Sequence, residues 1–171
     1  GIEVAVQEGG LDDLSVRLES GTLDLAVLSA PEGLDPAFRS QPLYTERYVV
    51  VFPPGHRFEG LDAIRLKDVS GEAYVDRLAC EMRDLVTATC KTKEVELYAT
   101  FQSEREDWIQ GMVMADMGFA FMPEYSVTLG ALLSRPLIDP VVERTVLLVS
   151  PPGRRHSPAA AVFARDARTH R

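Results

Sequence analysis

Ser20-Gly21-Thr22-Leu23-Asp24-Leu25-Ala26-Val27-Leu28 is the stretch on which the fold depends. Leucines recur at helical spacing over residues 11–20, which predicts an amphipathic helix. Glycine adopts the left-handed conformation that commonly ends a helix, so Gly21 predicts the helix end. The run from 23 to 28 has the length and apolar content of a strand covered on both faces, and only Asp24 interrupts it. A helix followed at once by a buried strand is one corner of an α/β lobe.

Length and composition limit the function classes. The chain has 171 residues, which suits one or two small α/β units with a hydrophobic core. It holds 18 Lys and Arg against 26 Asp and Glu, so its formal net charge of −8 argues against this segment itself binding nucleic-acid phosphates. A DNA-binding domain elsewhere in a longer chain is still compatible with this charge. There is no bilayer-spanning apolar run and no signal segment, so we expect no membrane partner. Two cysteines in an α/β chain favour a reducing compartment, and we expect a cytoplasmic location.

The remaining elements follow from periodicity and turn residues. Strands are expected at 2–6, 38–44, 46–52, 73–75, 95–101, 119–122 and 142–150. Helices are expected at 77–90, 104–117 and 158–167, with a helical turn at 66–69 and a helix or turn at 124–133. Ser103 and Glu106 have the spacing of a capping box, and Ser157 precedes a proline at the first helical position.

Two internal similarities indicate a second lobe. The motif Glu-Arg-x-Val followed by Pro-Pro-Gly begins at Glu46 and again at Glu143, and the order helix, glycine, buried strand over 16–28 recurs at 109–122. The alternative is chance similarity of short apolar strands. Two similar lobes joined by two crossing strands would form a hinge around a cleft that suits a small ligand. The chain would then leave lobe I near Val51 and return near Val149.

Three blocks carry a resemblance to a known family. They are LESGTLDLAV at 18–27, PLYTERYVVVFPPGH at 42–56 and VMADMGFAFMP at 113–123. In order and spacing they resemble the effector-binding domain of LysR-type transcriptional regulators, over nearly the whole chain. The resemblance implies an α/β, periplasmic-binding-protein-like (type 2) fold with two Rossmann-like lobes joined by two crossing strands. We expect lobe I at 1–51 and 147–171, and lobe II at 52–146.

The resemblance also implies partners. Such regulators bind DNA through an N-terminal winged helix-turn-helix, which is missing from this sequence, as are the first strand and helix of lobe I. They bind a small effector between the lobes and assemble with themselves as dimers or tetramers. The segment 2–6 is a candidate for that self-contact, by resemblance only.

Candidate effector contacts are carried over position by position. They are Ser29, Ala30, Tyr74, Arg77, Phe101, Gln102 and Ser103. The physical case is best for Ser103, because a helix N-terminus favours an anionic ligand such as a carboxylate. An ordinary helix cap is the simpler interpretation of Ser103, and a core position is equally compatible with Phe101. Arg77 could pair with an anionic effector, although a surface salt bridge with a nearby Glu or Asp is favoured.

Cys80 and Cys90 are possible redox residues, because peroxide-sensing members of the resembled family use two cysteines in this region. The nearby Arg77 and Arg83 could lower a thiol pKa. Ten positions on an intact helix correspond to a rise of about 15 Å, too far for a disulfide. Buried, unreactive thiols are therefore favoured over a switch, which would require the helix to break.

No motif supports catalysis. The sequence has no metal-ligand spacing, no phosphate-binding glycine loop and no Gly-x-Ser-x-Gly elbow, so we expect no metal, no cofactor and no enzyme. The favoured hypothesis is a ligand-sensing domain whose effector shifts the population of lobe arrangements and so the oligomer geometry. The alternatives are a periplasmic solute-binding protein, a thiol-based peroxide sensor of the same regulator family, and, with less support, an enzyme on the same scaffold.

Overall fold

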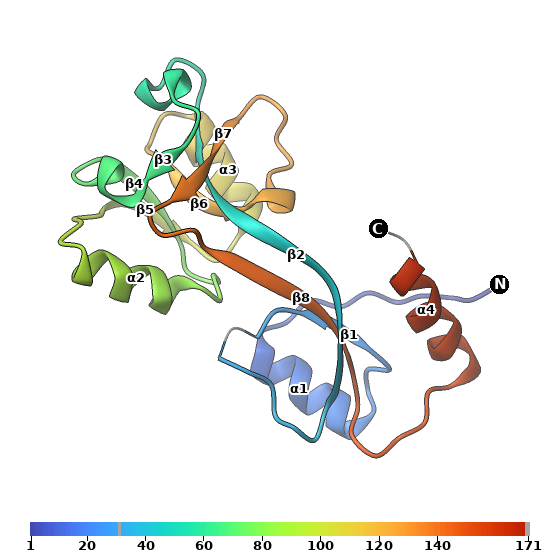
Figure 1. The fold of residues 1–171 in the computed structure, drawn as a ribbon. Helices are drawn as coiled ribbons and strands as arrows, with labels where there is room; N and C mark the ends of the chain where they lie inside the picture. The colour runs from blue at the N-terminus through green and yellow to red at the C-terminus, as the bar shows by residue number, and fades with distance from the viewer. Residues whose placement is uncertain (31, 170–171) are drawn as a thin grey trace. The chain divides into compact units, whose positions relative to one another are not determined.

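The structure is a computed structural model that describes residues 1–30 and 32–169. The chain divides into two compact units, here called unit 1 (residues 1–45 and 145–171) and unit 2 (residues 46–144). Strands β2 (Arg39–Phe52) and β8 (Glu143–Ser150) each contain one of the two boundaries (Figure 1). The sequence placed these boundaries at 51/52 and 146/147.

Unit 1 is built on the expected helix and turn. Helix α1 (Leu11–Ser20) ends at Gly21, whose φ of 78° is left-handed and whose N–H donates to the carbonyl of Leu18. Strand β1 (Ala26–Leu28) pairs antiparallel with β8, and helix α4 (Pro158–Thr169) follows. The small core comprises Leu18, Ala26, Phe38 and Val149. The helix, its glycine end and the C-terminal helix confirm the prediction.

Two predictions for unit 1 are wrong. Residues 2–6 form no strand, and the side chains of Ile2, Val4 and Val6 are exposed. The strand expected at 23–28 is only three residues long, and Val27 is 54% exposed. Both errors have one physical cause. Within the described residues β1 is an edge strand that pairs only with β8, and no strand pairs with the segment 2–6.

Unit 2 contains most of the regular structure. Its elements, besides its part of β2 and β8, are the 3₁₀ helices η1 (Arg57–Gly60), η2 (Leu66–Val69) and η3 (Glu124–Ser126), the strands β3 (Ile64–Arg65), β4 (Ala73–Arg77), β5 (Tyr98–Ser103), β6 (Ala120–Pro123) and β7 (Leu133–Ile138), and the helices α2 (Arg83–Thr92) and α3 (Glu106–Met114). Strand β2 pairs antiparallel with β6 and β7, β3 pairs parallel with β7, and β4 pairs parallel with β5. An isolated parallel bridge joins Tyr74 of β4 to Phe119, the residue directly before β6.

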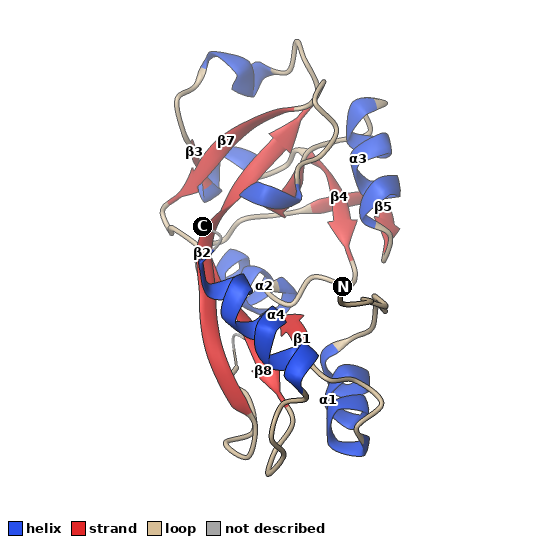
Figure 2. Ribbon diagram, turned by 90° about the vertical axis from the view of Figure 1, so that its right-hand side faces the viewer, coloured by secondary structure: helices blue, strands red, loops and turns tan. Residues whose placement is uncertain are grey.

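Alternation along the strands gives this sheet two apolar faces. Tyr48, Val50 and Phe52 belong to one cluster, which includes Val86 and Cys90 of α2. Val49 and Val51 belong to the other cluster, which includes Ile109 and Val113 of α3. Successive strand residues point to opposite faces, so α2 and α3 cover opposite faces of the sheet. Figure 2 shows α3 alongside β4 and β5, with which it makes its contacts.

Several boundaries in unit 2 correct the sequence analysis. The segments expected at 38–44 and 46–52 are one strand, β2. Strand β7, which begins at the last residue of the expected helix-or-turn region 124–133, was not predicted. The helix expected from residue 77 begins at Arg83, because residues 78–82 form consecutive turns. The helix expected at 104–117 is the shorter α3. In the described part of the chain, no helix is both long enough and apolar enough to cross a membrane.

Candidate functional site

A cavity of about 400 Å³ lies entirely within unit 2. It lies at the carboxyl end of β4, against α2, β5 and β6. Its lining residues are Tyr74, Asp76, Arg77, Cys80, Arg83, Val86, Thr87, Cys90, Lys91, Val95, Leu97, Ala99, Gln102 and Phe121. Aliphatic and aromatic side chains therefore share the wall with a few charged and polar groups, which is the usual composition of a small-molecule site. We call this cavity the unit 2 pocket.

Asp76 is the centre of the polar part of the unit 2 pocket. It receives hydrogen bonds from Arg83 Nη2 at 2.8 Å, Gln102 Nε2 at 3.0 Å and the Tyr74 hydroxyl at 3.3 Å. The Asp76 side chain is 7% exposed and that of Arg83 is 41% exposed. Burial opposes the charged form, but the Arg83 guanidinium and the other two donors outweigh it and hold the pKa of Asp76 below its ordinary value. Burial and the nearby Asp76 carboxylate raise the pKa of Tyr74, so its hydroxyl stays protonated and donates.

Arg77 is buried and already paired. Its Nε donates to the Glu106 carboxylate at 2.8 Å and 3.1 Å, and its Nη2 donates to the same group. Burial lowers the pKa of Arg77, but the bonds to Glu106 reverse this effect, and the net pKa lies above its ordinary value. The expected carboxylate partner is confirmed, but the expected surface location is wrong, because the Arg77 side chain is only 6% exposed.

The unit 2 pocket carries an excess of positive charge. Arg77, Arg83 and Lys91 line it, whereas Asp76 is the only acidic residue in the lining. Glu106, which pairs with Arg77, is not among the lining residues. Arg77 and Arg83 are already paired, with Glu106 and Asp76, so among the described residues Lys91 is the lining cation without a carboxylate partner, and it is the group by which the wall favours an anionic over a cationic small molecule.

Ser103 and Phe101 do not line the unit 2 pocket, although their strand does. The Ser103 hydroxyl accepts a hydrogen bond from the Arg105 amide at 3.0 Å, so it caps the turn before α3. The expected capping box is wrong, because α3 begins at Glu106 and the Glu106 carboxylate pairs with Arg77 instead. Phe101 is half-buried and packs on the cluster that includes Val49 and Val51.

Ser29 and Ala30 lie in unit 1, directly after β1, and both are half-buried. Neither lines the unit 1 cavity described below. Their role as effector contacts therefore stays a prediction.

The two cysteines lie at the unit 2 pocket, and both are free thiols. Cys80 is in the turns before α2, whereas Cys90 is buried in the helix. The expectation that one helix separates them is wrong, and the 15 Å rise inferred from it does not apply. Burial raises the pKa of Cys90, which disfavours its thiolate.

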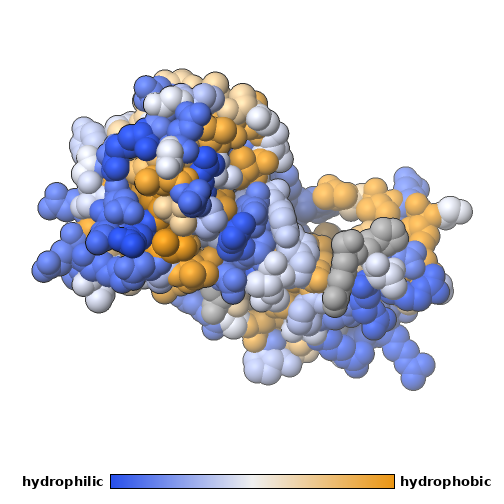
Figure 3. Space-filling model, turned by 45° about the horizontal axis from the view of Figure 1, so that its top comes forward, coloured by the Kyte–Doolittle hydropathy of each residue, from blue (hydrophilic) through white to orange (hydrophobic). Residues whose placement is uncertain are grey.

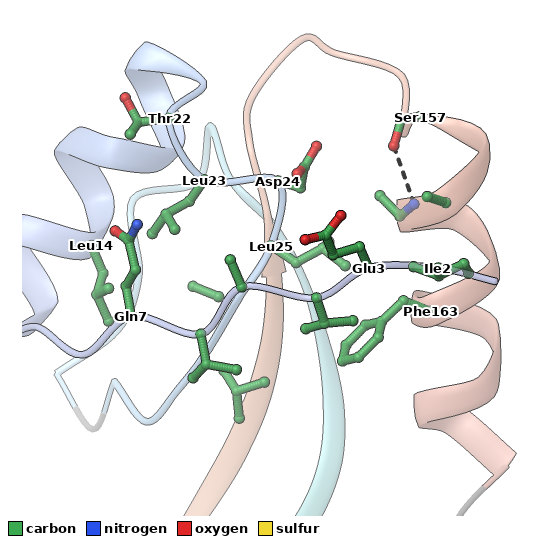
Figure 4. Close-up of a pocket in the computed structure, with 17 residues that line it drawn as sticks. Ile2, Glu3, Gln7, Leu14, Thr22, Leu23, Asp24, Leu25, Ser157 and Phe163 are labelled. Carbon is green, nitrogen blue, oxygen red and sulfur yellow. Dashed lines mark hydrogen bonds between the residues drawn. The ribbon is translucent and has the colours of Figure 1, made fainter.

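A second cavity, of about 460 Å³, lies in unit 1. Residues 2–7 run along it between α1 and α4, and the ring of Phe163 reaches into it (Figure 4). Its lining is mainly aliphatic, with Glu3 and Asp24 as the charged members. It lacks the convergent hydrogen bonds of the unit 2 pocket, so we regard it as an apolar groove. The face drawn in Figure 3 is mixed, with hydrophobic patches separated by hydrophilic side chains.

Sequence reasoning found part of the pocket lining and missed the rest. Tyr74, Arg77 and Gln102 were expected and share the unit 2 pocket, whereas Asp76 and Arg83 were not singled out as contacts. The signal that could have identified them was a carboxylate near the end of a buried strand, Asp76, followed by an arginine at the start of a helix, Arg83. Among the described residues there is no cluster of three or more His, Cys, Asp or Glu that could hold a metal ion.

Comparison with known proteins gives one family. The family model described as the LysR substrate binding domain matches residues 1–171. The transcriptional dual regulator GltC of Bacillus subtilis is 26% identical over 168 residues, which are 95% of this chain and 55% of the relative. A hydrogen peroxide-inducible genes activator of Haemophilus influenzae is 27% identical over 158 residues, covering 89% of this chain and 52% of the relative. The chain thus spans about half the length of these curated relatives.

Solved structures share the fold. The Synechocystis PCC6803 CcmR regulatory domain, in complex with 2-PG, matches with a TM-score of 0.84 and 16% identity over 98% of this chain and 82% of that chain. The effector binding domain of QuiR, in complex with shikimate, matches with a TM-score of 0.79 and 23% identity over 95% of this chain and 78% of that chain. The matches establish a periplasmic-binding-protein-like (type 2) α/β fold for this chain.

Proposed function

Because this chain belongs to the LysR substrate binding domain family, we propose that it is the ligand-sensing domain of a DNA-binding transcriptional regulator. The curated relatives named above are both regulators, and each is about twice the length of the matched region. DNA binding is then the task of a winged helix-turn-helix outside this segment, which agrees with the formal net charge of −8. Soluble, cytoplasmic action and assembly as a dimer or tetramer follow from the same proposal.

The observation that carries the proposal is the unit 2 pocket. Its apolar wall and its excess of positive charge suit a small anionic effector. Similar domains have been solved with shikimate and with 2-PG. We place the effector against Arg83 and Gln102, with Tyr74 and Arg77 behind them. The roles proposed for Ser29, Ala30, Phe101 and Ser103, which do not line this pocket, stay predictions. Effector binding would favour one arrangement of the domain and so shift the population of regulator states.

A ligand screen tests this proposal. The full-length protein is screened by thermal shift against small carboxylates and phosphates, and the affinity of any hit is measured by calorimetry. We expect Arg83→Ala to weaken binding about tenfold or more, since it removes a charged donor. Arg105→Ala is the matched control, because Arg105 pairs with Asp107 on the exposed surface and does not line the pocket. Equal affinity of the two variants would contradict the placement of the effector.

A thiol-based peroxide sensor is the second candidate. It rests on Cys80 and Cys90 lining one pocket and on similarity to peroxide-inducible activators. Peroxide treatment followed by non-reducing mass spectrometry distinguishes it: a sensor forms a Cys80–Cys90 disulfide, and a pure effector domain does not. Cys90→Ser would abolish that disulfide.

A further inference from the structure

Glu81 lies beside the unit 2 pocket but is not part of its lining. It belongs to the turns 78–82, where the Cys80 amide donates to the Arg77 carbonyl and the Arg83 amide donates to the Cys80 carbonyl. Cys80 lines the pocket and Glu81 follows it. The Glu81 carboxylate accepts hydrogen bonds from the Tyr48 hydroxyl at 3.2 Å and from Arg144 Nη1.

Arg144 continues this chain of contacts. It is near the start of β8, its side chain is 16% exposed, and its Nε donates to Glu46 Oε1 at 2.9 Å. The Glu46 side chain on β2 is fully buried, and its second oxygen accepts the Tyr125 amide at 2.8 Å. Glu46 and Arg144 are also the first and last residues of unit 2. The contacts therefore end where the two strands leave the unit.

We propose that Glu81 is a positioning residue that ties the pocket turn, through Arg144, to the two strands β2 and β8 at the boundary of unit 2. One guanidinium holds two carboxylates, one on the pocket turn and one on β2. A movement of the pocket turn must then move Arg144 or leave a carboxylate without its partner. Uncompensated charge is costly in such a shielded site, so the network moves as a unit.

The Tyr48 hydroxyl adds a second link to the same turn. It lies 3.6 Å from Cys80 Sγ and donates to Glu81, and Tyr48 itself is on β2. Burial, together with the neighbouring Cys80 and Glu81, raises the pKa of Tyr48, which therefore remains a donor. The rate at which the Cys80 thiol is alkylated therefore depends on whether the turn 78–82 is held against Tyr48.

The test measures the coupling between the pocket turn and Glu46 on β2, and it uses no effector. The proposal rests on the proposed function only in taking the unit 2 pocket as the effector site, so the coupling can be found or refuted whether or not an effector binds there. The rate of Cys80 alkylation by iodoacetamide is measured by peptide-resolved mass spectrometry in the full-length protein. Glu81→Gln frees the turn, and we expect the Cys80 rate to rise about fivefold. Glu46→Gln should change the rate by at least about threefold in the native background and leave it unchanged in the Glu81→Gln background.

Controls separate coupling from unfolding. Glu124→Gln is matched to Glu46→Gln, because Glu124 pairs with Arg47 on β2 and does not contact Arg144, and it should leave the Cys80 rate unchanged. Cys90 is buried, so equal alkylation of Cys80 and Cys90 signals an unfolded variant. In that case Arg144→Lys, which keeps one charge but cannot hold both carboxylates, takes the place of Glu46→Gln under the same criteria.

Two results would overturn the proposal. One is an unchanged Cys80 rate in the folded Glu46→Gln or Arg144→Lys variant. The other is a double variant in which the two effects multiply, since independent effects mean that Glu81 does not transmit the change.

Discussion

At the scale of single residues, Asp76 joins a strand, a helix and a neighbouring strand through one carboxylate. Its depressed pKa means that the ionised form stabilises the fold above the unfolded pKa of about 3.9. That contribution is lost as the pH falls through the lower folded pKa. We expect Asp76→Asn to lower the free energy of unfolding by about 2 kcal/mol at pH 7 and by progressively less below about pH 4.

Urea unfolding at several pH values measures this difference. Asp62→Asn, at an exposed position, is the control and should stay within about 0.5 kcal/mol of the native protein. A difference for Asp76→Asn that is constant down to about pH 2 would show that the charge of Asp76 is not the source of its effect.

Gly118 is a residue whose conformation permits no side chain. Its φ of 138° is rarely adopted by other residues, and a Cβ there would overlap the Ala73 carbonyl of β4. That carbonyl accepts the Phe119 amide at 3.0 Å, so relief of the overlap must disturb the junction of β4 and β6. We expect Gly118→Ala to cost about 2–4 kcal/mol in unfolding free energy, measured by urea titration.

Gly130 offers the matched control for this substitution. It has no left-handed φ, and no atom lies within 4 Å of the place that a Cβ would take, so Gly130→Ala should be neutral or slightly stabilising. Equal destabilisation by both substitutions would refute the steric argument for Gly118.

At the scale of elements, α4 begins with a cap that the sequence predicted. The Ser157 hydroxyl accepts the Ala160 amide at 3.1 Å, and Pro158 occupies the first helical position. We expect Ser157→Ala to lower the unfolding free energy by about 1 kcal/mol and to speed hydrogen exchange at the Ala160 amide. Ser15→Ala, within α1, should be neutral or slightly stabilising. Unchanged exchange at Ala160 would mean that the cap does not secure this helix end.

The sequence predicted those elements whose formation depends on residues close by in the chain. Helix α1, its left-handed Gly21 and the start of α4 depend on neighbouring residues, and all were predicted. Strand β7 contains Pro136 and Arg135 and forms because it pairs with β2 from more than 80 positions away. The segment 2–6 shows the converse, since it has a strand pattern but no strand partner among the described residues.

The same distinction holds for the candidate site. Tyr74, Arg77 and Gln102 were placed by family resemblance, and they share the unit 2 pocket. The capping box was misread because Glu106 pairs with an arginine 29 positions earlier, which no local pattern reveals. The network of Glu46, Glu81 and Arg144 was likewise invisible, since it joins residues far apart in the sequence.

At the scale of the whole molecule, the two units differ in how much core they contain. Unit 2 holds both large clusters of buried residues, one on each face of its sheet. The cluster in unit 1 has four buried members, and β1 lies at the edge of its sheet. Unit 1 is also built from two chain segments, whereas unit 2 is continuous. Burial of apolar surface is the main source of stability, so unit 1 should be the less stable part of this chain.

Hydrogen exchange of the 171-residue chain in increasing urea tests this difference. We expect peptides from α1 and α4 to lose protection at a lower urea concentration than peptides from β2 residues 48–52 and β6, because the latter lie between α2 and α3. Ile109→Ala, in the core of unit 2, should lower protection in unit 2 by about 2–5 kcal/mol. If all these peptides instead lose protection together in the native chain, the two units unfold as one cooperative structure, and the small core of unit 1 must draw its stability from unit 2.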